Sequence, residues 1–388
     1  MKLIYFWIGF FLIHCSITSV KEGEAKIVER FEKTFKNSKY SKAATLLVHS
    51  DSLKIHLKSS AGLLEDQKSK VIPDQPFHTA SIGKMFTSVL IYQLVESGKL
   101  SLNDSVQKIL GAEILINLFV YEGVDYSEKA TISHLLSHTS GVDDYFDSVD
   151  KKNKSVIDEI TTNPEKFWTP LDLVNFTRTN QKAIAPPGAK FHYSDTGYIL
   201  LGLVIEKITN KKLEVVLQEK IFAPLAMKNT YMYLRSEPSD KTKLPVSTMM
   251  LGDKNVTGFK SISADWAGGG LISTTEDLLL FQKALLNGKL VPNKTYLSLM
   301  GKNKFMDGIY YGQGLMTVRF GDMSFLMPST PDSHGHSGLL STLLFYSPDY
   351  DSHMIVNLGS TEDVGDTFEL MFWIMQDLKE IKNLTKGK

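Results

Sequence analysis

The chain has 388 residues, 43% hydrophobic and 22% charged, and its 43 basic and 43 acidic side chains cancel to a formal net charge of zero. This composition is that of an ordinary globular protein, and the length predicts one large domain or two closely packed subdomains. The balanced charge excludes the clustered excess of Lys and Arg that a nucleic-acid-binding surface needs.

The N-terminal segment has the pattern of a signal peptide. After a charged start, residues 3–13 form an unbroken apolar run that is too short to span a bilayer. We therefore assign residues 1–19 to targeting and expect an exported protein, periplasmic or extracellular. Cys15, the only cysteine, ends a stretch that partly resembles a bacterial lipobox. Two interpretations stay open, namely simple cleavage after Ser16 or Ser19, and lipidation of Cys15 with anchoring to a membrane.

Apolar periodicity predicts strands first and helices next. Residues 42–61 have the pattern of a β-hairpin. Residues 81–96 carry apolar side chains nearly all round a helix, which predicts a buried central helix that ends at Gly98. Further helices are expected at residues 131–136, from Thr169-Pro170, at 196–208 and at 213–221.

The last part of the chain returns to strands. Ser273-Thr274-Thr275-Glu276 has the pattern of a capping box, which begins a helix ending near Gly288. Alternation then predicts strands at residues 314–320, 323–327, 339–346 and 354–358, with turns at 321–322 and 348–351, and a closing helix at 363–381.

Strands near both chain ends around a helical middle indicate the α+β class. We expect an antiparallel β-sheet formed from the N- and C-terminal segments, flanked by helices, with an inserted mostly helical subdomain. Within residues 20–388, the α/β part is assigned to about 20–80 and 262–388, and the helical part to about 81–261.

Three short motifs carry the chemistry. Ser81 and Lys84 lie one helical turn apart on the same face, so the lysine amine can reach the serine hydroxyl. A serine needs such a neighbouring base to act as a nucleophile at neutral pH. Tyr193-Ser194-Asp195 follows the turn Pro186-Pro187-Gly188, and His336-Ser337-Gly338 is expected at the start of a strand.

In this order the motifs resemble those of the serine β-lactamase-like family, which includes class C β-lactamases, D-alanyl-D-alanine carboxypeptidases and related esterases. Residues 131–141, 193–202 and 268–274 also resemble the family. The resemblance covers nearly the whole chain after the signal segment. It implies a β-lactamase/transpeptidase-like fold and a covalent acyl-serine mechanism, with no metal and no organic cofactor.

The resemblance implies a role for each motif residue. Ser81 would attack a carbonyl carbon and become acylated, and Lys84 would help to deprotonate it. Tyr193 would relay the proton between nucleophile and leaving group. The backbone N–H groups of Ser81 and Leu339 would form the oxyanion hole.

The last motif would bind the substrate. Gly338 has no side chain, which would let the substrate lie along the strand edge beside His336 and Ser337. His336 replaces the lysine of the β-lactamases, and a histidine near its ordinary pKa binds a carboxylate only partly. This replacement weakens the β-lactamase interpretation.

Asp195 also departs from the family, which usually has Asn at this position. An ionised Asp only accepts hydrogen bonds, whereas Asn can donate one to a substrate amide. Asp195 could instead pair with Lys84 and raise the pKa of the lysine, or cap the helix at residues 196–208. These roles can coexist.

Other polar residues have simpler interpretations. His134 and His138 are expected to be structural and to make backbone hydrogen bonds. Asp332, His334 and His336 imitate a metal cluster, but a metal site needs three oriented ligands, and we expect none here. Residues 268–270, all glycine, lack the lysine of a phosphate loop and instead let the backbone pass close to the site.

The sequence thus predicts an exported serine hydrolase acting on a small-molecule ester, amide or peptide, of the esterase or D-amino-acid peptidase type. The alternatives are a D-alanyl-D-alanine carboxypeptidase or a β-lactamase. A different class also stays open, a catalytically silent ligand-binding or sensor module of the same fold, which Asp195 favours. The pattern does not define an oligomeric state.

Overall fold

The computed structural model describes residues 17–146, 155–241, 243–292, 295, 299–324 and 330–386. Cys15 and most of the predicted targeting segment lie outside these residues. Ile17 is buried and its N–H donates to Glu380 (2.9 Å), and Ser19 caps the first helix. Among the helices of the described ranges, none is long and apolar enough to cross a membrane.

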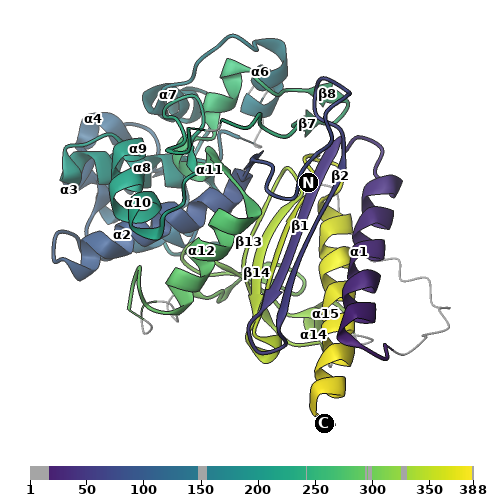
Figure 1. Ribbon diagram of the computed structural model, residues 1–388. Helices are drawn as coiled ribbons and strands as arrows, with labels where there is room; N and C mark the ends of the chain where they lie inside the picture. The colour runs from purple at the N-terminus through teal and green to yellow at the C-terminus, as the bar shows by residue number, and fades with distance from the viewer. Residues whose placement is uncertain are drawn as a thin grey trace.

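An eight-stranded antiparallel sheet joins the two ends of the chain (Figure 1). The order of its strands is β10 (Asn303–Met306), β11 (Ile309–Tyr311), β12 (Met316–Val318), β13 (Ser333–Gly338), β14 (Thr342–Ser347), β15 (Ser352–Asn357), β1 (Ala43–Ser50) and β2 (Ile55–Gly62). The N-terminal hairpin therefore pairs directly with the last strand, Thr45 opposite Asn357. The predicted α+β sheet built from both termini is confirmed.

Two terminal helices cover one face of this sheet. Helix α1 (Val20–Asn37) lies beside α15 (Val364–Lys386), as Figure 1 shows. Ile27 and Phe31 of α1 join a core cluster with side chains of α15 and the sheet. Arg30 binds the buried carboxylate of Asp377 through two hydrogen bonds of 2.6 and 3.2 Å, which fixes the two helices to each other.

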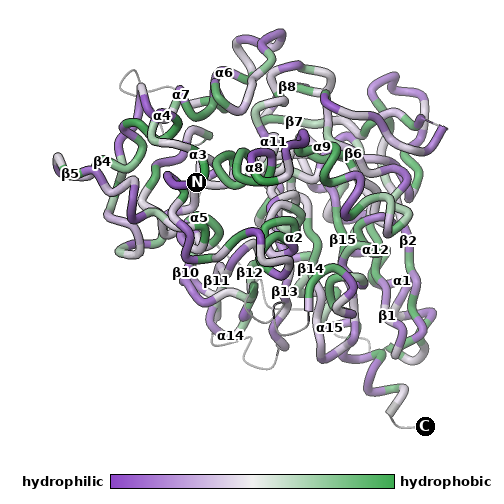
Figure 2. The backbone as a smooth tube through the Cα atoms, turned by 90° about the vertical axis from the view of Figure 1, so that its left-hand side faces the viewer, coloured by the Kyte–Doolittle hydropathy of each residue, from purple (hydrophilic) through white to green (hydrophobic). Residues whose placement is uncertain are grey.

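The opposite face packs against α12 (Thr275–Leu286) and the helical region. Helices α2 (Gly83–Glu96) and α8 (Asp195–Thr209) form the centre of this region, and both are largely hydrophobic in Figure 2. The other α-helices described in this region are α3 (Val106–Leu110), α4 (Ala112–Leu115), α5 (Ile132–Leu136), α6 (Val156–Thr162), α7 (Pro170–Asn180), α9 (Leu213–Leu217), α10 (Ala223–Leu225) and α11 (Trp266–Gly269). The short helix α14 (Phe320–Met323) packs against α15 instead.

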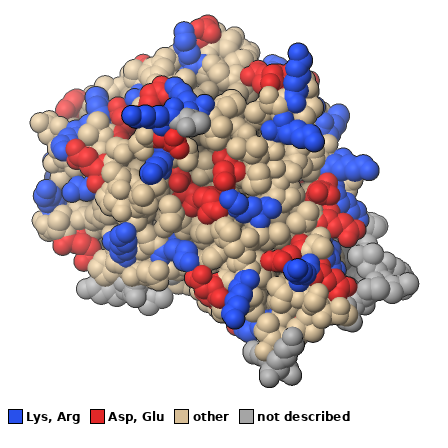
Figure 3. Space-filling model, in the orientation of Figure 1, with Lys and Arg blue, Asp and Glu red and all other residues tan. Residues whose placement is uncertain are grey.

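A small sheet supports the segment that carries Ser81. Its strand order is β3 (Phe77–His78), β9 (Leu271–Ser273) and β6 (Tyr231–Met232). Two short hairpins complete the strands, β4 (Val120–Tyr121) with β5 (Val124–Asp125), and β7 (Met250–Leu251) with β8 (Lys254–Asn255). On the surface, basic and acidic side chains are interspersed over the face shown in Figure 3.

The strand predicted at residues 323–327 is not present at its start, where Met323 belongs to a helix. Phe320–Met323 form α14, and the Tyr310 hydroxyl donates to Asp322 within it (2.8 Å), so residues 321–322 are helical rather than a turn between strands. Residues 325–329 lie outside the described part of the chain. The predicted capping box does not begin at Ser273, which belongs to β9. Thr274 caps α12 instead, and its hydroxyl accepts from the N–H of Asp277.

Candidate active site

Ser81 and Lys84 meet as their spacing predicts. Ser81 lies in a 3₁₀ turn, Ala80–Ile82, that leads directly into α2, and its side chain is partly exposed. Lys84 is fully buried, and its Nζ donates to Ser81 Oγ at 3.0 Å. Ala80, just before the serine, has a φ of 47°, which an L-residue rarely adopts. The surrounding packing therefore holds this turn in a strained conformation.

Lys84 uses all three of its donors inside the protein. Besides Ser81, it binds the Asp195 carboxylate and donates to the carbonyl of Gly268 (2.9 Å). Burial acts to lower the pKa of Lys84, but the charge of Asp195 and other nearby groups outweigh it and raise this pKa. The pairing of Asp195 with Lys84 is therefore present, and the lysine carries its proton in the resting site.

The other role considered for Asp195, capping its helix, is wrong. Ser194 is the N-cap of α8, and its hydroxyl accepts from the N–H of Gly197 (3.3 Å). Asp195 is the first residue of the helix itself, and its own N–H donates to Asp144 (2.9 Å). Its carboxylate is thereby directed to Lys84.

Tyr193 completes the group around Ser81. Its ring centroid lies 4.8 Å from Lys84 Nζ, and Lys84 and Ser81 both act to lower the pKa of its phenol. Burial raises the pKa of Tyr193 well above its ordinary value, more than the adjacent Lys84 charge lowers it. The phenol is therefore protonated at neutral pH and lies beside the nucleophile candidate.

His138 fixes the position of Tyr193 through backbone hydrogen bonds and ring stacking. Its carbonyl accepts from the N–H of His192 (2.8 Å) and its Nδ1 accepts from the N–H of Ser194 (3.1 Å), so it binds the backbone on both sides of the tyrosine. The imidazole also stacks on the Tyr193 ring, with centroids 4.2 Å apart. The prediction that His138 is structural is confirmed, and so is that for His134, whose Nδ1 accepts from the N–H of Thr131.

His336 lies near the end of strand β13 rather than at the start of a strand, and it faces inward. It is fully buried, with Nε2 against the Tyr311 hydroxyl (3.1 Å) and Nδ1 against the carbonyl of Ser337 (2.6 Å). Burial, reinforced by the charge of Lys84, lowers the pKa of His336 to about 3. His336 therefore does not supply part of the positive charge that would bind a carboxylate, as the sequence had suggested. The imidazole is neutral, and both of its nitrogens already contact groups inside the protein.

Packing gives Gly338 a further reason to lack a side chain, besides the predicted contact with substrate. A Cβ at this position would lie 2.7 Å from the carbonyl oxygen of Thr79 and 2.8 Å from the Cβ of Ala80. The missing side chain thus lets β13 approach the turn that carries Ser81. Thr342 on β14 reinforces this contact, since its hydroxyl donates to the Thr79 carbonyl (2.9 Å). Leu339 follows in the turn after β13, and its side chain is exposed.

The three glycines at 268–270 let the backbone pass close to the site, as predicted. A Cβ on Gly268 would lie 2.7 Å from Oδ1 of Asp195, and one on Gly269 would lie 2.3 Å from the carbonyl oxygen of Ala80. These contacts are shorter than real carbon contacts, so larger residues would displace either the Lys84–Asp195 pair or the serine turn.

Gly269→Ala is expected to lower both stability and activity, because its clash is with backbone. Overpacking of this kind costs about 1–3 kcal/mol in the free energy of unfolding. Gly197→Ala is the matched control, since a Cβ there meets nothing closer than 3.6 Å and alanine favours the helix. Urea unfolding and esterase assays of both variants test this, and equal behaviour of the two would contradict it.

Asp265 and His78 lie behind the site, and the sequence motifs do not indicate them. Burial raises the pKa of Asp265 to about 7, although the Lys84 charge acts in the opposite direction. His78 Nε2 lies 4.0 Å from Asp265 Oδ2, and burial lowers the pKa of His78 to about 4. Only the position of Asp265, three residues before the glycine run, could have suggested it.

The metal cluster imitated by Asp332, His334 and His336 does not form. His334 Nδ1 bonds the Thr317 hydroxyl (3.1 Å), and His336 faces Tyr311. Over the part of the chain that the structure describes, no three His, Cys, Asp or Glu side chains are arranged to hold a metal ion.

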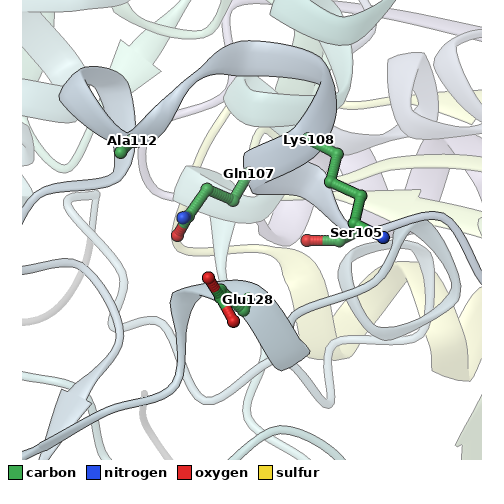
Figure 4. Close-up of a pocket in the computed structure, with 5 residues that line it drawn as sticks. All are labelled: Ser105, Gln107, Lys108, Ala112 and Glu128. Carbon is green, nitrogen blue, oxygen red and sulfur yellow. The ribbon is translucent and has the colours of Figure 1, made fainter.

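Two surface hollows lie outside this site. One, of about 330 Å³, is lined by Ser105, Gln107, Lys108, Ala112 and Glu128 (Figure 4). The other, of about 610 Å³, is lined by Tyr231 and by residues 233–237 and 243–246. Neither includes a residue of the three motifs.

Comparison with known proteins supports one family. The profile of the family described as Beta-lactamase matches residues 31–369. A Salmonella typhi protein, provisionally named a D-alanyl-D-alanine carboxypeptidase, is 27% identical over 321 residues, which cover 73% of this chain and 69% of that protein. Penicillin-binding protein 4* of Bacillus subtilis is 28% identical over 255 residues, which cover 61% of this chain and 51% of that protein.

Solved structures share the fold. A D-amino acid amidase from Ochrobactrum anthropi SV3 superposes with a TM-score of 0.75 at 18% identity, covering 93% of this chain and 99% of that one. A D-stereospecific amidohydrolase from a Streptomyces species gives a TM-score of 0.72 at 23% identity, covering 89% and 97%. At these identities the likeness establishes the fold alone.

Proposed function

The chain belongs to the Beta-lactamase family of serine hydrolases, and we propose that it cleaves esters and D-amino-acid amides through an acyl-serine intermediate on Ser81. One observation carries this proposal. The Lys84 ammonium donates to the hydroxyl of Ser81, which is partly exposed, and the Tyr193 phenol lies beside both. A helper group within hydrogen-bond reach of the nucleophile is what acyl transfer requires.

The proton route follows from the charges. Because Lys84 is held protonated by Asp195, it stabilises the developing negative charge on Ser81 Oγ instead of accepting its proton. The neutral Tyr193 can accept the serine proton while passing its own to the leaving group. Attack then forms the acyl–oxygen bond to Ser81 and expels an alcohol or amine, with no charge left on the tyrosine.

Water completes the cycle by the reverse route. It attacks the acyl carbon, gives a proton through Tyr193 to Ser81 Oγ, and releases the carboxylic acid. Backbone N–H groups of Ser81 and Leu339 are our candidates for binding the oxyanion, each contributing about 3 kcal/mol in the transition state.

The charge of the site supports this substrate class. A β-lactam antibiotic presents a carboxylate, but His336 is neutral and buried, so its side chain supplies no cation for that group. Esters and amides with an uncharged carbonyl region need none. The D-amino acid amidase that shares this fold acts on the same class of bond that we propose here.

Turnover of a substrate panel tests the proposal. We expect hydrolysis of p-nitrophenyl acetate and butyrate and of a D-amino-acid amide, with much slower turnover of nitrocefin. Preference for a D-Ala-D-Ala peptide would favour the carboxypeptidase, and preference for nitrocefin a β-lactamase. No turnover of any of them would favour the silent binding module. We also propose export, on the basis of the apolar run at residues 3–13.

A further inference from the structure

The strand before Ser81 carries a buried histidine that the proposed hydrolysis does not use. His78 is the last residue of β3, three positions before the nucleophile candidate, and its side chain is only 3% exposed. Burial lowers the pKa of His78 to about 4, so the imidazole is neutral at neutral pH. A neutral imidazole has one nitrogen that accepts a hydrogen bond and one that donates.

The contacts of His78 show which nitrogen is which. The backbone N–H of Ala80 donates to His78 Nδ1 at 3.2 Å, so the proton of the ring is on Nε2. Among the residues that the structure describes, Nε2 has no hydrogen-bond partner, and Asp265 Oδ2 lies 4.0 Å from it. When Asp265 is ionised, its negative charge favours a proton at Nε2, which keeps Nδ1 free to accept.

The peptide group between Thr79 and Ala80 is held by side chains at both ends. Its carbonyl accepts from the Thr342 hydroxyl (2.9 Å), and its N–H donates to His78 Nδ1. Because a peptide group is planar, these two contacts fix the orientation of its plane. The next rotation along the chain is the φ of Ala80, which has the strained value of 47°.

This rotation orients the peptide group that Ala80 shares with Ser81. The N–H of that group is our candidate oxyanion donor, and its carbonyl is packed so closely against Gly269 that a Cβ there would lie 2.3 Å away. Without an acceptor for the Ala80 N–H, the turn can relax toward an ordinary negative φ. Such a change would move both the Ser81 hydroxyl and its N–H.

We propose that His78 is a positioning residue for acyl transfer, which holds the Ala80 N–H so that Ser81 keeps the geometry needed for attack. This inference rests on the proposed function of Ser81. A displacement of about 1 Å at a reacting group can lower a rate by about 10²-fold. Loss of the contact should therefore slow the reaction at Ser81 while leaving the number of reactive sites unchanged.

Two replacements of His78 separate the hydrogen bond from packing. His78→Asn keeps an acceptor, because the amide oxygen takes the place of Nδ1 along the side chain, but it leaves part of the ring volume empty. His78→Leu fills more of that volume and has no acceptor. If packing alone mattered, His78→Leu would therefore be the milder change. If the hydrogen bond matters, His78→Asn is the milder one.

The rate and the endpoint of fluorophosphonate labelling measure the effect. At pH 8 Asp265 is ionised, since burial raises its pKa to about 7. We expect His78→Leu to label, and to hydrolyse p-nitrophenyl butyrate, about 10–100-fold more slowly than the wild type, and His78→Asn to recover most of the rate. The endpoint should stay the same in both variants. A merely structural loss would lower the endpoint and leave the rate of the remaining native molecules unchanged.

His353→Leu is the matched control. His353 on β15 is also a buried histidine, its Nδ1 bonds Gln282 (2.7 Å), and burial lowers its pKa to about 4. This variant should label at the wild-type rate. A wild-type rate in His78→Leu, a rate in His78→Asn as low as that in His78→Leu, or equal slowing in His353→Leu would overturn the proposal.

Hydrogen exchange at the Ala80 amide provides a readout that does not depend on hydrolysis. It should be faster in His78→Leu than in the wild type and His78→Asn, because an amide without its acceptor opens more readily. If the wild type neither labels nor turns over a substrate, the proposed function fails. Faster exchange in His78→Leu would then still support the role of His78 in holding the turn, and unchanged exchange would overturn that role.

Discussion

Ser81→Ala is expected to lower kcat/KM for p-nitrophenyl acetate by at least ~10³-fold and to abolish covalent labelling by a fluorophosphonate. The reason is that the variant retains Lys84 and Tyr193 but has no atom that can carry the acyl group. Intact-protein mass spectrometry after labelling, followed by peptide mapping, would detect the adduct on residue 81 of the wild type.

Ser97→Ala is the control for this variant. Ser97 ends the same helix, α2, and its hydroxyl donates only to backbone carbonyls. It should keep full labelling and turnover. Labelling that persists in Ser81→Ala, or turnover that is indifferent to this change, would place the nucleophile elsewhere and sink the acyl-serine proposal.

Lys84→Ala should give the largest combined loss of activity and stability. The change leaves the carboxylate of Asp195 buried without its cation, and breaking a buried ion pair in this way costs about 3–5 kcal/mol in the free energy of unfolding. It also removes the ammonium that donates to Ser81, so kcat should fall by about 10²–10³-fold. Urea denaturation and steady-state kinetics measure the two effects.

The double variant Lys84→Met with Asp195→Asn separates these effects. It removes both charges and keeps similar volumes, so most of the stability should return while activity stays low. If the double variant is as unstable as Lys84→Ala, packing rather than the unpaired charge is responsible. If Lys84→Ala keeps wild-type kcat, the ammonium has no role in catalysis.

Local spacing predicted the parts of the site that depend on a single element. Ser81 and Lys84 are joined by helix geometry alone, and the Thr131 cap and the hairpin at residues 42–61 likewise rest on neighbouring residues. Asp195 and Lys84 are 111 positions apart in the sequence. The sequence therefore left two roles open for Asp195, pairing with Lys84 and capping the helix that follows. The structure decides between these roles, because Ser194 occupies the N-cap position of α8.

The inward direction of His336 could not be predicted from its motif. It depends on Tyr311 of β11, whose hydroxyl reaches Nε2 across the intervening strand β12. The packing reason for Gly338 is also tertiary, since a side chain there would meet Thr79 and Ala80. Strand register and close backbone approach therefore decide what the motif residues contact.

The insertion of β1 between β15 and β2 has a consequence for how the chain acquires its fold. Thr45 pairs with Asn357, so the central sheet cannot be completed before β15, more than 300 residues after β1, has left the ribosome. Contacts of such long sequence separation close slowly. Until then the inner edge of the N-terminal hairpin stays open to pairing with other chains. Folding of the nascent chain therefore competes with such pairing until β15 emerges and covers this edge.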